Sequence, residues 1–220
     1  MKNPTIETGA SRLAGLAVLA FAGFGAGIAL MHVLRPDYAL ANHMVSDYAV
    51  GPWGAVMTGA FACASIGCLA LAIGLVRSRL VSGVGWLVVA LFAVAAVGLT
   101  VTALYPTDVG EGPPTPTGEI HTMSFLVNIL SIVLASIGLA IVSFRDARWR
   151  TYRVGSVVLS LLLIVALVVQ IKTLHRGMPY GLANRAFVVV LVTWLLATAW
   201  TLRRLSLGAA ARSAWAASDR

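Results

Sequence analysis

Six apolar runs decide what this chain can fold into. They fall near residues 12–34, 53–76, 83–104, 120–142, 154–174 and 183–202, and Gly, Pro or charged residues bound each of them. Each run has about 20 residues, the length that an α-helix needs to cross a bilayer. Lipid offers no partner to backbone N–H and C=O groups, which favours helices over strands. The sequence therefore predicts an all-α polytopic membrane protein, with six transmembrane helices in one bundle.

The composition leaves no room for a soluble domain. Hydrophobic residues make up 59% of the chain and charged residues 11%, whereas a soluble domain carries about 25% charged residues. We expect an N-terminal tail over 1–11, a six-helix domain over 12–204 and a basic tail over 205–220. No small-residue cleavage site follows the first run, so we interpret it as a retained helix. Cys63 and Cys68 lie in one run without CxxC spacing, and we expect them to be packing residues.

The basic residues predict the orientation of the bundle. Twelve of the sixteen Lys and Arg residues fall on the side of the spans that holds both termini: Lys2, Arg12, Arg77, Arg79, Arg145, Arg148, Arg150, Arg153, Arg203, Arg204, Arg212 and Arg220. The other side carries only Arg35, Lys172, Arg176 and Arg185. Lys and Arg concentrate in cytoplasmic loops, so both termini should be cytoplasmic. The net charge of +8 then follows from this bias and from attraction to anionic lipid, and it does not require nucleic acid as a partner.

Acidic residues and histidines gather on the opposite, outer side. Of the eight acidic residues, Asp37, Asp47, Asp108, Glu111 and Glu119 lie there, and all four histidines fall at or beyond outer helix ends. Acidic residues contribute little to topology, so this distribution needs another cause. We therefore look for a functional site on the outer face.

The segment between the first two runs contains a candidate acid/base pair. His43 and Asp47 are four residues apart, so a short helical turn would place them on one face. Ser46 lies beside Asp47 and could act as a nucleophile if His121 were its base. Tyr38, with Tyr48 and Trp53, suits a membrane interface, and we also include Tyr38 among the candidate ligand-binding residues.

The segment between the third and fourth runs brackets a second candidate. Pro106 ends the third helix and Asp108 follows it. We expect Thr117 to N-cap the fourth helix and Glu119 to lie in its first turn. His121 lies one turn further in, where a helix N-terminus favours the neutral imidazole.

A polar stripe continues along the fourth helix. Ser124, Asn128 and Ser131 follow His121 at spacings of three, four and three, which is one face of a helix. In lipid such a stripe should face protein or a wet cavity. Interhelical hydrogen bonding is the structural alternative to ligand binding.

Arg185 opens the sixth helix on the outer side, within the sequence GLANR. This position opposes the positive-inside tendency and the positive end of the helix dipole, so we expect an anion nearby. Asp47, Asp108, a lipid phosphate or a substrate carboxylate could supply it. Arg185, Asn184, Tyr38, Asn128 and Ser124 are the candidate ligand-binding residues, and Gln170 and Lys172 could line the same opening.

Several of these residues together resemble the domain of unknown function 998 family, six-helix membrane proteins of bacteria and archaea. The resemblance rests on Pro36 and Tyr38, on Ser46-Asp47-Tyr48-Ala49, on Pro106 with Asp108, on Gly118 with His121, and on Arg185; Tyr105 stands where a Phe is expected. It spans roughly residues 12–204 and implies a six-helix fold in a prokaryotic cell membrane. The family is remotely similar to the Frag1/DRAM/Sfk1 family, which is linked to lipid organisation. The resemblance brings no established activity.

Three functions remain open. The first is a membrane protein that binds, senses or moves a lipid or small amphipathic molecule at an outward-facing site. The second is a membrane-embedded enzyme acting on a lipid or isoprenoid, with Asp47, Asp108 and His121 as acid/base groups or ligands of a divalent metal such as zinc. The third is a structural or partner-binding bundle. No HExxH, HxxxH or CxxC spacing supports the metal.

Overall fold

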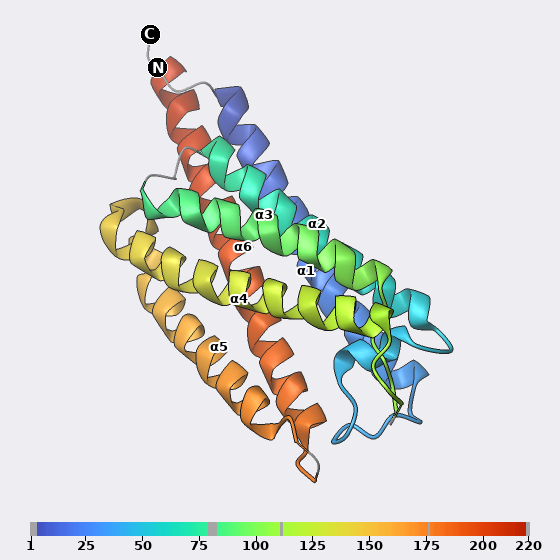
Figure 1. The fold of residues 1–220 in the computed structure, drawn as a ribbon. Helices are drawn as coiled ribbons and strands as arrows, with labels where there is room; N and C mark the ends of the chain where they lie inside the picture. The colour runs from blue at the N-terminus through green and yellow to red at the C-terminus, as the bar shows by residue number, and fades with distance from the viewer. Residues whose placement is uncertain (1–3, 79–82, 111, 176, 219–220) are drawn as a thin grey trace.

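A computed structural model describes residues 4–78, 83–110, 112–175 and 177–218 (Figure 1). Within these residues the chain is all-α. Its elements are α1 (Pro4–Leu34), the 3-10 helix η1 (Val45–Ala49), α2 (Gly54–Ser78), α3 (Val84–Leu104), α4 (Pro116–Arg145), the 3-10 helix η2 (Ala147–Tyr152), α5 (Arg153–Thr173) and α6 (Tyr180–Ser218). Lys2, Arg79, Glu111, Arg176 and Arg220, named above, lie outside the described residues.

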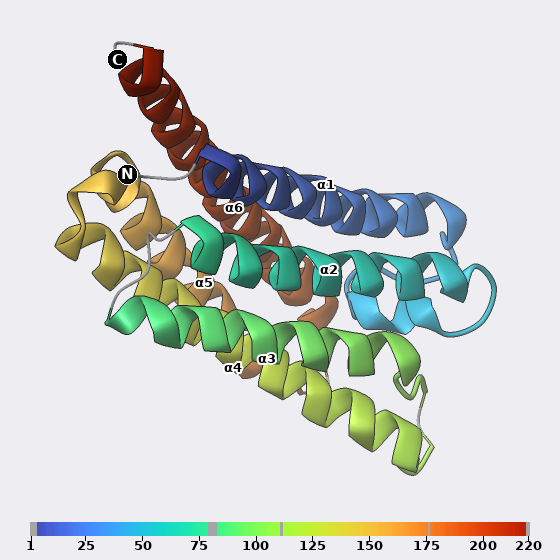
Figure 2. The ribbon, with the colours of Figure 1, turned by 90° about the horizontal axis from the view of Figure 1, so that it is seen from above.

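Each of the six predicted apolar runs lies almost wholly within one long helix. All six helices are long and apolar enough to cross a membrane, so the predicted fold class is confirmed and the chain is a multi-pass membrane protein. The helices pack in chain order, each against the next, and α6 returns to pack against α1 (Figure 2). At their ends, α1 and α6 extend into the two segments that the sequence analysis treats as tails.

The bundle has two distinct ends. The first residues of α1 and the last residues of α6 lie at one end, which we call the terminal end (Figure 1). The segment that joins α1 to α2, the segment that joins α3 to α4 and the start of α6 lie at the other, which we call the distal end. The described residues that the sequence analysis assigns to the outer side are therefore at the distal end.

The side chains that point away from the bundle are apolar. Leu19, Val33 and Val154 are 72%, 75% and 75% exposed, which suits a surface solvated by lipid tails. Small residues fill the contacts between helices, as is usual when membrane helices approach closely. A Cβ atom at Gly67 of α2, for example, would overlap the ring of Phe21 in α1. Cys63 and Cys68 are both free and lie in α2, and Cys68 is fully buried.

Candidate functional site

Arg35 organises the segment that follows α1. Its side chain is almost fully buried and binds Asp37 in a fork, with Nε 2.9 Å from Oδ1 and Nη2 2.8 Å from Oδ2. Nη1 also donates to the Val50 carbonyl at 2.8 Å. The guanidinium carbon lies 3.9 Å from the ring centre of Tyr38. Hydrogen bonding to Arg35 holds the pKa of Asp37 below its usual value.

His43 and Asp47 meet as the spacing predicts. Asp47 Oδ2 accepts a hydrogen bond from the Met44 backbone N–H at 2.9 Å and lies 3.3 Å from His43 Nδ1. The ring of Tyr38 stacks on that of His43, with centroids 4.3 Å apart. Burial raises the pKa of Asp47, although both hydrogen bonds and nearby positive charge oppose the rise. Tyr38 is thus packed within the segment between α1 and α2.

Arg185 binds neutral acceptors on the same segment. Nη1 donates to the carbonyls of Leu40 at 2.9 Å and His43 at 2.5 Å, and Nη2 donates to the Tyr48 hydroxyl at 3.0 Å. Nε donates to His32 Nε2 at 2.9 Å. No carboxylate among the described residues lies within 4 Å of this guanidinium, so the predicted ion pair with Asp47 or Asp108 is not formed. Carbonyls of the irregular segment, which have no helical partner, supply the negative partial charge instead.

The contact with His32 fixes the state of that imidazole. His32 Nδ1 lies 2.7 Å from the Ile28 carbonyl oxygen, which can only accept, so Nδ1 carries a proton. Arg185 can only donate, so Nε2 must carry the lone pair. The arrangement therefore requires neutral His32 with its hydrogen on Nδ1.

Gly181 and Asn184 complete the attachment of this segment to α6. The Gly181 N–H donates to the Ala41 carbonyl at 2.8 Å, and Asn184 Oδ1 accepts from the Val45 N–H at 2.9 Å. A Cβ atom at Gly181 would overlap the carbonyls of Leu40 and His43, so only glycine allows this approach. We call Gly181, Asn184 and Arg185 the α6 clamp. Asn184 and Arg185 thus contact protein where the sequence analysis expects a ligand.

Asp108 shapes the entry to α4. Its Oδ2 accepts from the Thr115 N–H at 2.9 Å and its Oδ1 from the Thr115 hydroxyl at 2.7 Å, while Thr115 Oγ1 accepts from the Gly118 N–H at 3.1 Å. These hydrogen bonds lower the pKa of Asp108. A Cβ atom at Gly118 would overlap the Asp108 carboxylate. The prediction that Thr117 caps α4 is wrong, because Thr115 is the N-cap and Pro116, with its fixed φ, takes the first helical position.

His121 and the polar stripe of α4 face α3. His121 is 3% exposed and its Nδ1 lies 2.7 Å from the Tyr105 carbonyl. Asn128 Nδ2 donates to Thr102 Oγ1 at 2.9 Å, Thr102 and Ser124 share a hydrogen bond of 2.8 Å, and Ser124 donates to the His121 carbonyl. The stripe faces protein, one of the two predicted environments, and Ser131 is also buried. Within this hydrogen-bond network Asn128 Oδ1 has no partner, and it lies against Gly98 of α3.

The predicted acid/base and metal residues form no metal-binding cluster among the described residues, although the charges of Asp47 and Asp108 both act on His121. In the part of the chain that the structure describes, no three His, Cys, Asp or Glu side chains are placed to hold a metal ion, so Asp47, Asp108 and His121 do not form the predicted ligand set. Ser46 forms no hydrogen bond with His121, whose Nδ1 is used by Tyr105. The reason is topological, since Asp47 and Ser46 belong to the segment held by α6, whereas Asp108 and His121 join α3 to α4.

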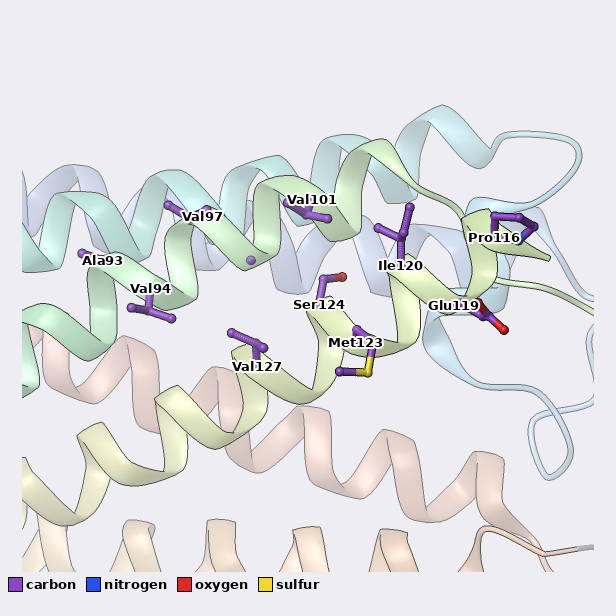
Figure 3. Close-up of a pocket in the computed structure, with 11 residues that line it drawn as sticks. Ala93, Val94, Val97, Val101, Pro116, Glu119, Ile120, Met123, Ser124 and Val127 are labelled. Carbon is purple, nitrogen blue, oxygen red and sulfur yellow. The ribbon is translucent and has the colours of Figure 1, made fainter. Parts of the chain in front are cut away.

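A groove runs between α3 and α4 toward the distal end (Figure 3). Its volume is about 840 Å³. Its lining is almost wholly apolar and comprises Ala93, Val94, Val97, Gly98, Val101, Pro116, Glu119, Ile120, Met123, Ser124 and Val127. Ser124 and Glu119 are its polar side chains, and Glu119 lies at the distal end of the row (Figure 3).

A second, more polar cavity adjoins the groove. It has a volume of about 520 Å³ and is lined by Thr107, Asp108, Gly112, Pro114, Gly118, Glu119, Thr122 and Met123. Glu119 and Met123 line both cavities, so the two cavities adjoin at these side chains. His121 lines neither. The two cavities together pass from the apolar middle of α3 and α4 to the polar segment that joins these helices.

Comparison with protein families identifies the chain. The profile of the family described as protein of unknown function (DUF998) matches residues 10–201. The chain belongs to the DUF998 family. No curated protein and no solved structure gives a significant match.

The residues that carry the DUF998 resemblance now have structural roles. Asp108 and Gly118 meet at the N-terminus of α4, and His121 ties α4 to the end of α3. Arg185 and Tyr48 meet at the α6 clamp. The sequence analysis found these residues but missed the valines of the groove, because a valine that lines a groove and one that faces bulk lipid look alike in an apolar run. In the sequence, Gly98 was the residue that could have indicated the groove, because a glycine places no side chain on that face of α3.

Proposed function

We propose that this protein binds a membrane lipid at its distal end, with an acyl or isoprenoid chain in the groove between α3 and α4 and the head group in the adjoining polar cavity. The observation that carries the proposal is that an apolar groove and a more polar cavity adjoin at Glu119 and Met123. An amphipathic molecule needs an apolar slot that ends in a polar pocket. The groove volume of about 840 Å³ falls within the range of known ligand pockets, roughly 300–1,000 Å³.

The position of the groove favours a lipid over a water-soluble solute. Its walls belong to α3 and α4, both long and apolar enough to span a membrane, so it opens toward lipid tails. Lipid tails are as apolar as the groove, so burying the chain there brings no hydrophobic gain over the bilayer. Selectivity would come from close packing of the chain and from contacts of the head group.

The hydrogen bonding of the polar residues favours binding over catalysis. Asp108 is engaged by Thr115, His121 by Tyr105, and Arg185 by carbonyls and a hydroxyl. These side chains are therefore already engaged in hydrogen bonds within the protein. The side chain at the junction of the cavities, Glu119, is exposed instead, which suits contact with a ligand.

We further propose that the distal end faces the outside of a prokaryotic cell membrane. The basic residues support this orientation, because Arg12, Arg77, Arg145, Arg203 and Arg204 all fall at the terminal end. A lipid bound at the distal end would then come from the outer leaflet.

Photo-crosslinking tests the binding site. Protein in bilayers that contain a phospholipid with a diazirine in its acyl chain is irradiated, and the adducts are mapped by mass spectrometry. We expect adducts concentrated on residues 93–101 and 120–127, and we expect Val97→Trp, which fills the groove, to reduce them. Val189→Trp, at a position of α6 that is 65% exposed, is the matched control and should leave them unchanged. Adducts spread evenly over all lipid-facing helices, or unaffected by Val97→Trp, would refute the proposal.

A further inference from the structure

The imidazole of His32 links α1 to the α6 clamp. Its Nε2 accepts a hydrogen bond from Arg185 Nε at 2.9 Å, and its Nδ1 donates to the Ile28 carbonyl at 2.7 Å. The ring also meets that of Tyr48 edge to face, with centroids 5.3 Å apart. Tyr48 is fully buried, and its hydroxyl accepts from Arg185 Nη2. His32 therefore contacts both the guanidinium that holds the segment between α1 and α2 and a buried side chain of that segment.

This contact requires a neutral imidazole. A protonated ring carries a hydrogen on both nitrogens. His32 Nε2 and Arg185 Nε would then be two donors, each belonging to a cation, at a separation of 2.9 Å. No carboxylate among the described residues lies within 4 Å of His32 to offset the repulsion. A proton on His32 and the contact with Arg185 therefore exclude each other.

The guanidinium of Arg185 transmits any displacement to the segment. The Nη1 atom of this guanidinium donates to the carbonyls of Leu40 and His43, so the plane that faces His32 also holds the segment. A guanidinium is rigid and planar, so a movement of Nε away from His32 moves Nη1 and Nη2 as well. Loss of the contact with His32 therefore weakens the hydrogen bonds that attach the segment to α6.

We propose that the α6 clamp is a pH-sensitive switch, in which protonation of His32 displaces Arg185 and releases the segment between α1 and α2 from α6. His32 is half-buried and lies in the last turn of α1 at the distal end, so protons of the aqueous phase can reach it. Free imidazole takes up a proton with a pKa of about 6.5, whereas the clamped form takes up none. The clamp is therefore held above about pH 6.5 and is released progressively as the pH falls below that value. This inference does not depend on the proposed lipid binding.

Other titratable groups near the clamp determine the choice of controls. His43 Nδ1 lies 3.3 Å from Asp47 Oδ2, so a proton on His43 would create an ion pair within the segment instead of repelling α6. The charge of Arg185 acts on Asp47, so titration of Asp47 also affects the clamp. This contribution of Asp47 is the same in variants of His32 as in the wild type. α2 also packs against α1, and Arg77, its charged residue, lies in its last turn at the terminal end.

Amide hydrogen exchange measures the release. The Gly181 N–H donates to the Ala41 carbonyl and the Val45 N–H donates to Asn184 Oδ1, so both amides lose protection when the segment leaves α6. The full-length protein in a neutral detergent is labelled at pH 7.5 and at pH 5.0, and the rates are corrected for the intrinsic effect of pH on exchange. We expect the protection factors of both amides to fall roughly thirtyfold, the factor by which a free imidazole shifts the equilibrium over this range. Residues 146–152, at the terminal end, should keep their protection.

Variants of His32 give the decisive comparison. The amide oxygen of His32→Gln can accept from Arg185 but takes up no proton in this pH range, so both amides should stay protected at pH 5.0. His32→Asn tests the same point with a shorter side chain. His43→Gln is the matched control, since it removes an imidazole of the segment but keeps the carbonyl that Arg185 uses, and it should lose protection as the wild type does. Unchanged protection in the wild type at pH 5.0, or an equal fall in the His32 variants, would overturn the inference.

Discussion

Arg35 and Arg185 each direct a guanidinium toward backbone carbonyls of the segment between α1 and α2. That segment has few helical hydrogen bonds, so its carbonyls need other donors. Arginine offers five N–H groups in a rigid plane and can bind several carbonyls at once. Single residues thus hold an irregular segment at the edge of the membrane.

Loss of the guanidinium of Arg185 should destabilise the distal end. Arg185→Ala would leave the carbonyls of Leu40 and His43 without their donor, and hydrogen bonds to a charged group contribute about 1.5–3 kcal/mol each. We expect a fall of several degrees in Tm in detergent, and only partial recovery in Arg185→Lys, since an ammonium cannot reproduce the fork. Lys172→Ala, at an exposed position near the same end of α5, is the control. An unchanged Tm in Arg185→Ala would show that the α6 clamp is not structural.

The partly buried carboxylate of Asp47 should give a pH dependence of the opposite sign to that of an ordinary salt-bridged acid. Its folded pKa is raised by burial, so the folded state binds the proton more tightly than the unfolded state does. Stability linked to Asp47 is therefore fully present below the unfolded pKa of about 3.9 and is lost as the pH rises through the folded pKa.

A comparison with Asp47→Asn isolates this contribution. As the pH falls from neutral toward 4, the Tm of the wild type should rise relative to that of Asp47→Asn. Thermal melting in detergent at a series of pH values measures the difference. A difference that shrinks as the pH falls would mean that Asp47 is stabilised as a carboxylate by Met44 and His43.

The sequence predicts contacts between near neighbours better than contacts across the fold. The four-residue spacing of His43 and Asp47 was enough to predict their contact. His43 precedes the N-cap of η1, and the contact forms because Asp47 reaches back from η1 to the Met44 N–H and to His43. The partners of Arg185 were not predictable, since three of them come from residues 32, 43 and 48 and meet it only once α6 has packed against α1. The placement of the charge against the helix dipole led us to expect an anion beside Arg185, whereas its acceptors in the structure are carbonyls, a hydroxyl and a ring nitrogen.

At the level of elements, the N-terminus of α4 depends on a loop residue. Asp108 positions Thr115, and Thr115 caps the Gly118 N–H. Both Thr115 and Thr117 are good N-caps, so local propensity did not distinguish them, and we predicted Thr117. Thr115 is the cap because the fold of residues 105–110 brings Asp108 to it. Local helix propensity contains no information about this contact.

Disruption of this cap should fray the first turn of α4. We expect Asp108→Ala to increase amide hydrogen exchange over residues 117–120, because Thr115 would lose the two bonds that orient it. Gly118→Ala should act in the same direction, since its methyl group would displace the Asp108 carboxylate. Val109→Ala, at an exposed neighbouring position, should exchange like the wild type. Unchanged protection in Asp108→Ala would contradict the capping role.

For the whole molecule, the sequence was sufficient to predict an all-α six-helix membrane protein. Length and hydropathy determine which segments can span a bilayer, and the structure confirms every span. The groove was not predictable, because it depends on how the side chains of α3 and α4 pack around Gly98, Ser124 and Met123. The sequence of one apolar run contains no information about the distance between its helix and the neighbouring helix. The His and Arg residues of the predicted site make hydrogen bonds within the protein. The candidate site therefore lies beside Glu119, where the groove and the polar cavity adjoin.

The central claim is that the groove and the adjoining cavity form one lipid site, and a lipid titration of the melting temperature tests it most directly. A ligand that binds only the folded state raises Tm increasingly with its free concentration, because it adds RT ln(1 + [L]/Kd) to the free energy of unfolding. With dioleoyl phosphatidylethanolamine added to delipidated protein in detergent, we expect a concentration-dependent rise in Tm for the wild type and for Val189→Trp, and a greatly reduced rise for Val97→Trp. A wild type whose Tm does not rise with lipid concentration, or a Val97→Trp variant that responds as the wild type does, would contradict the account.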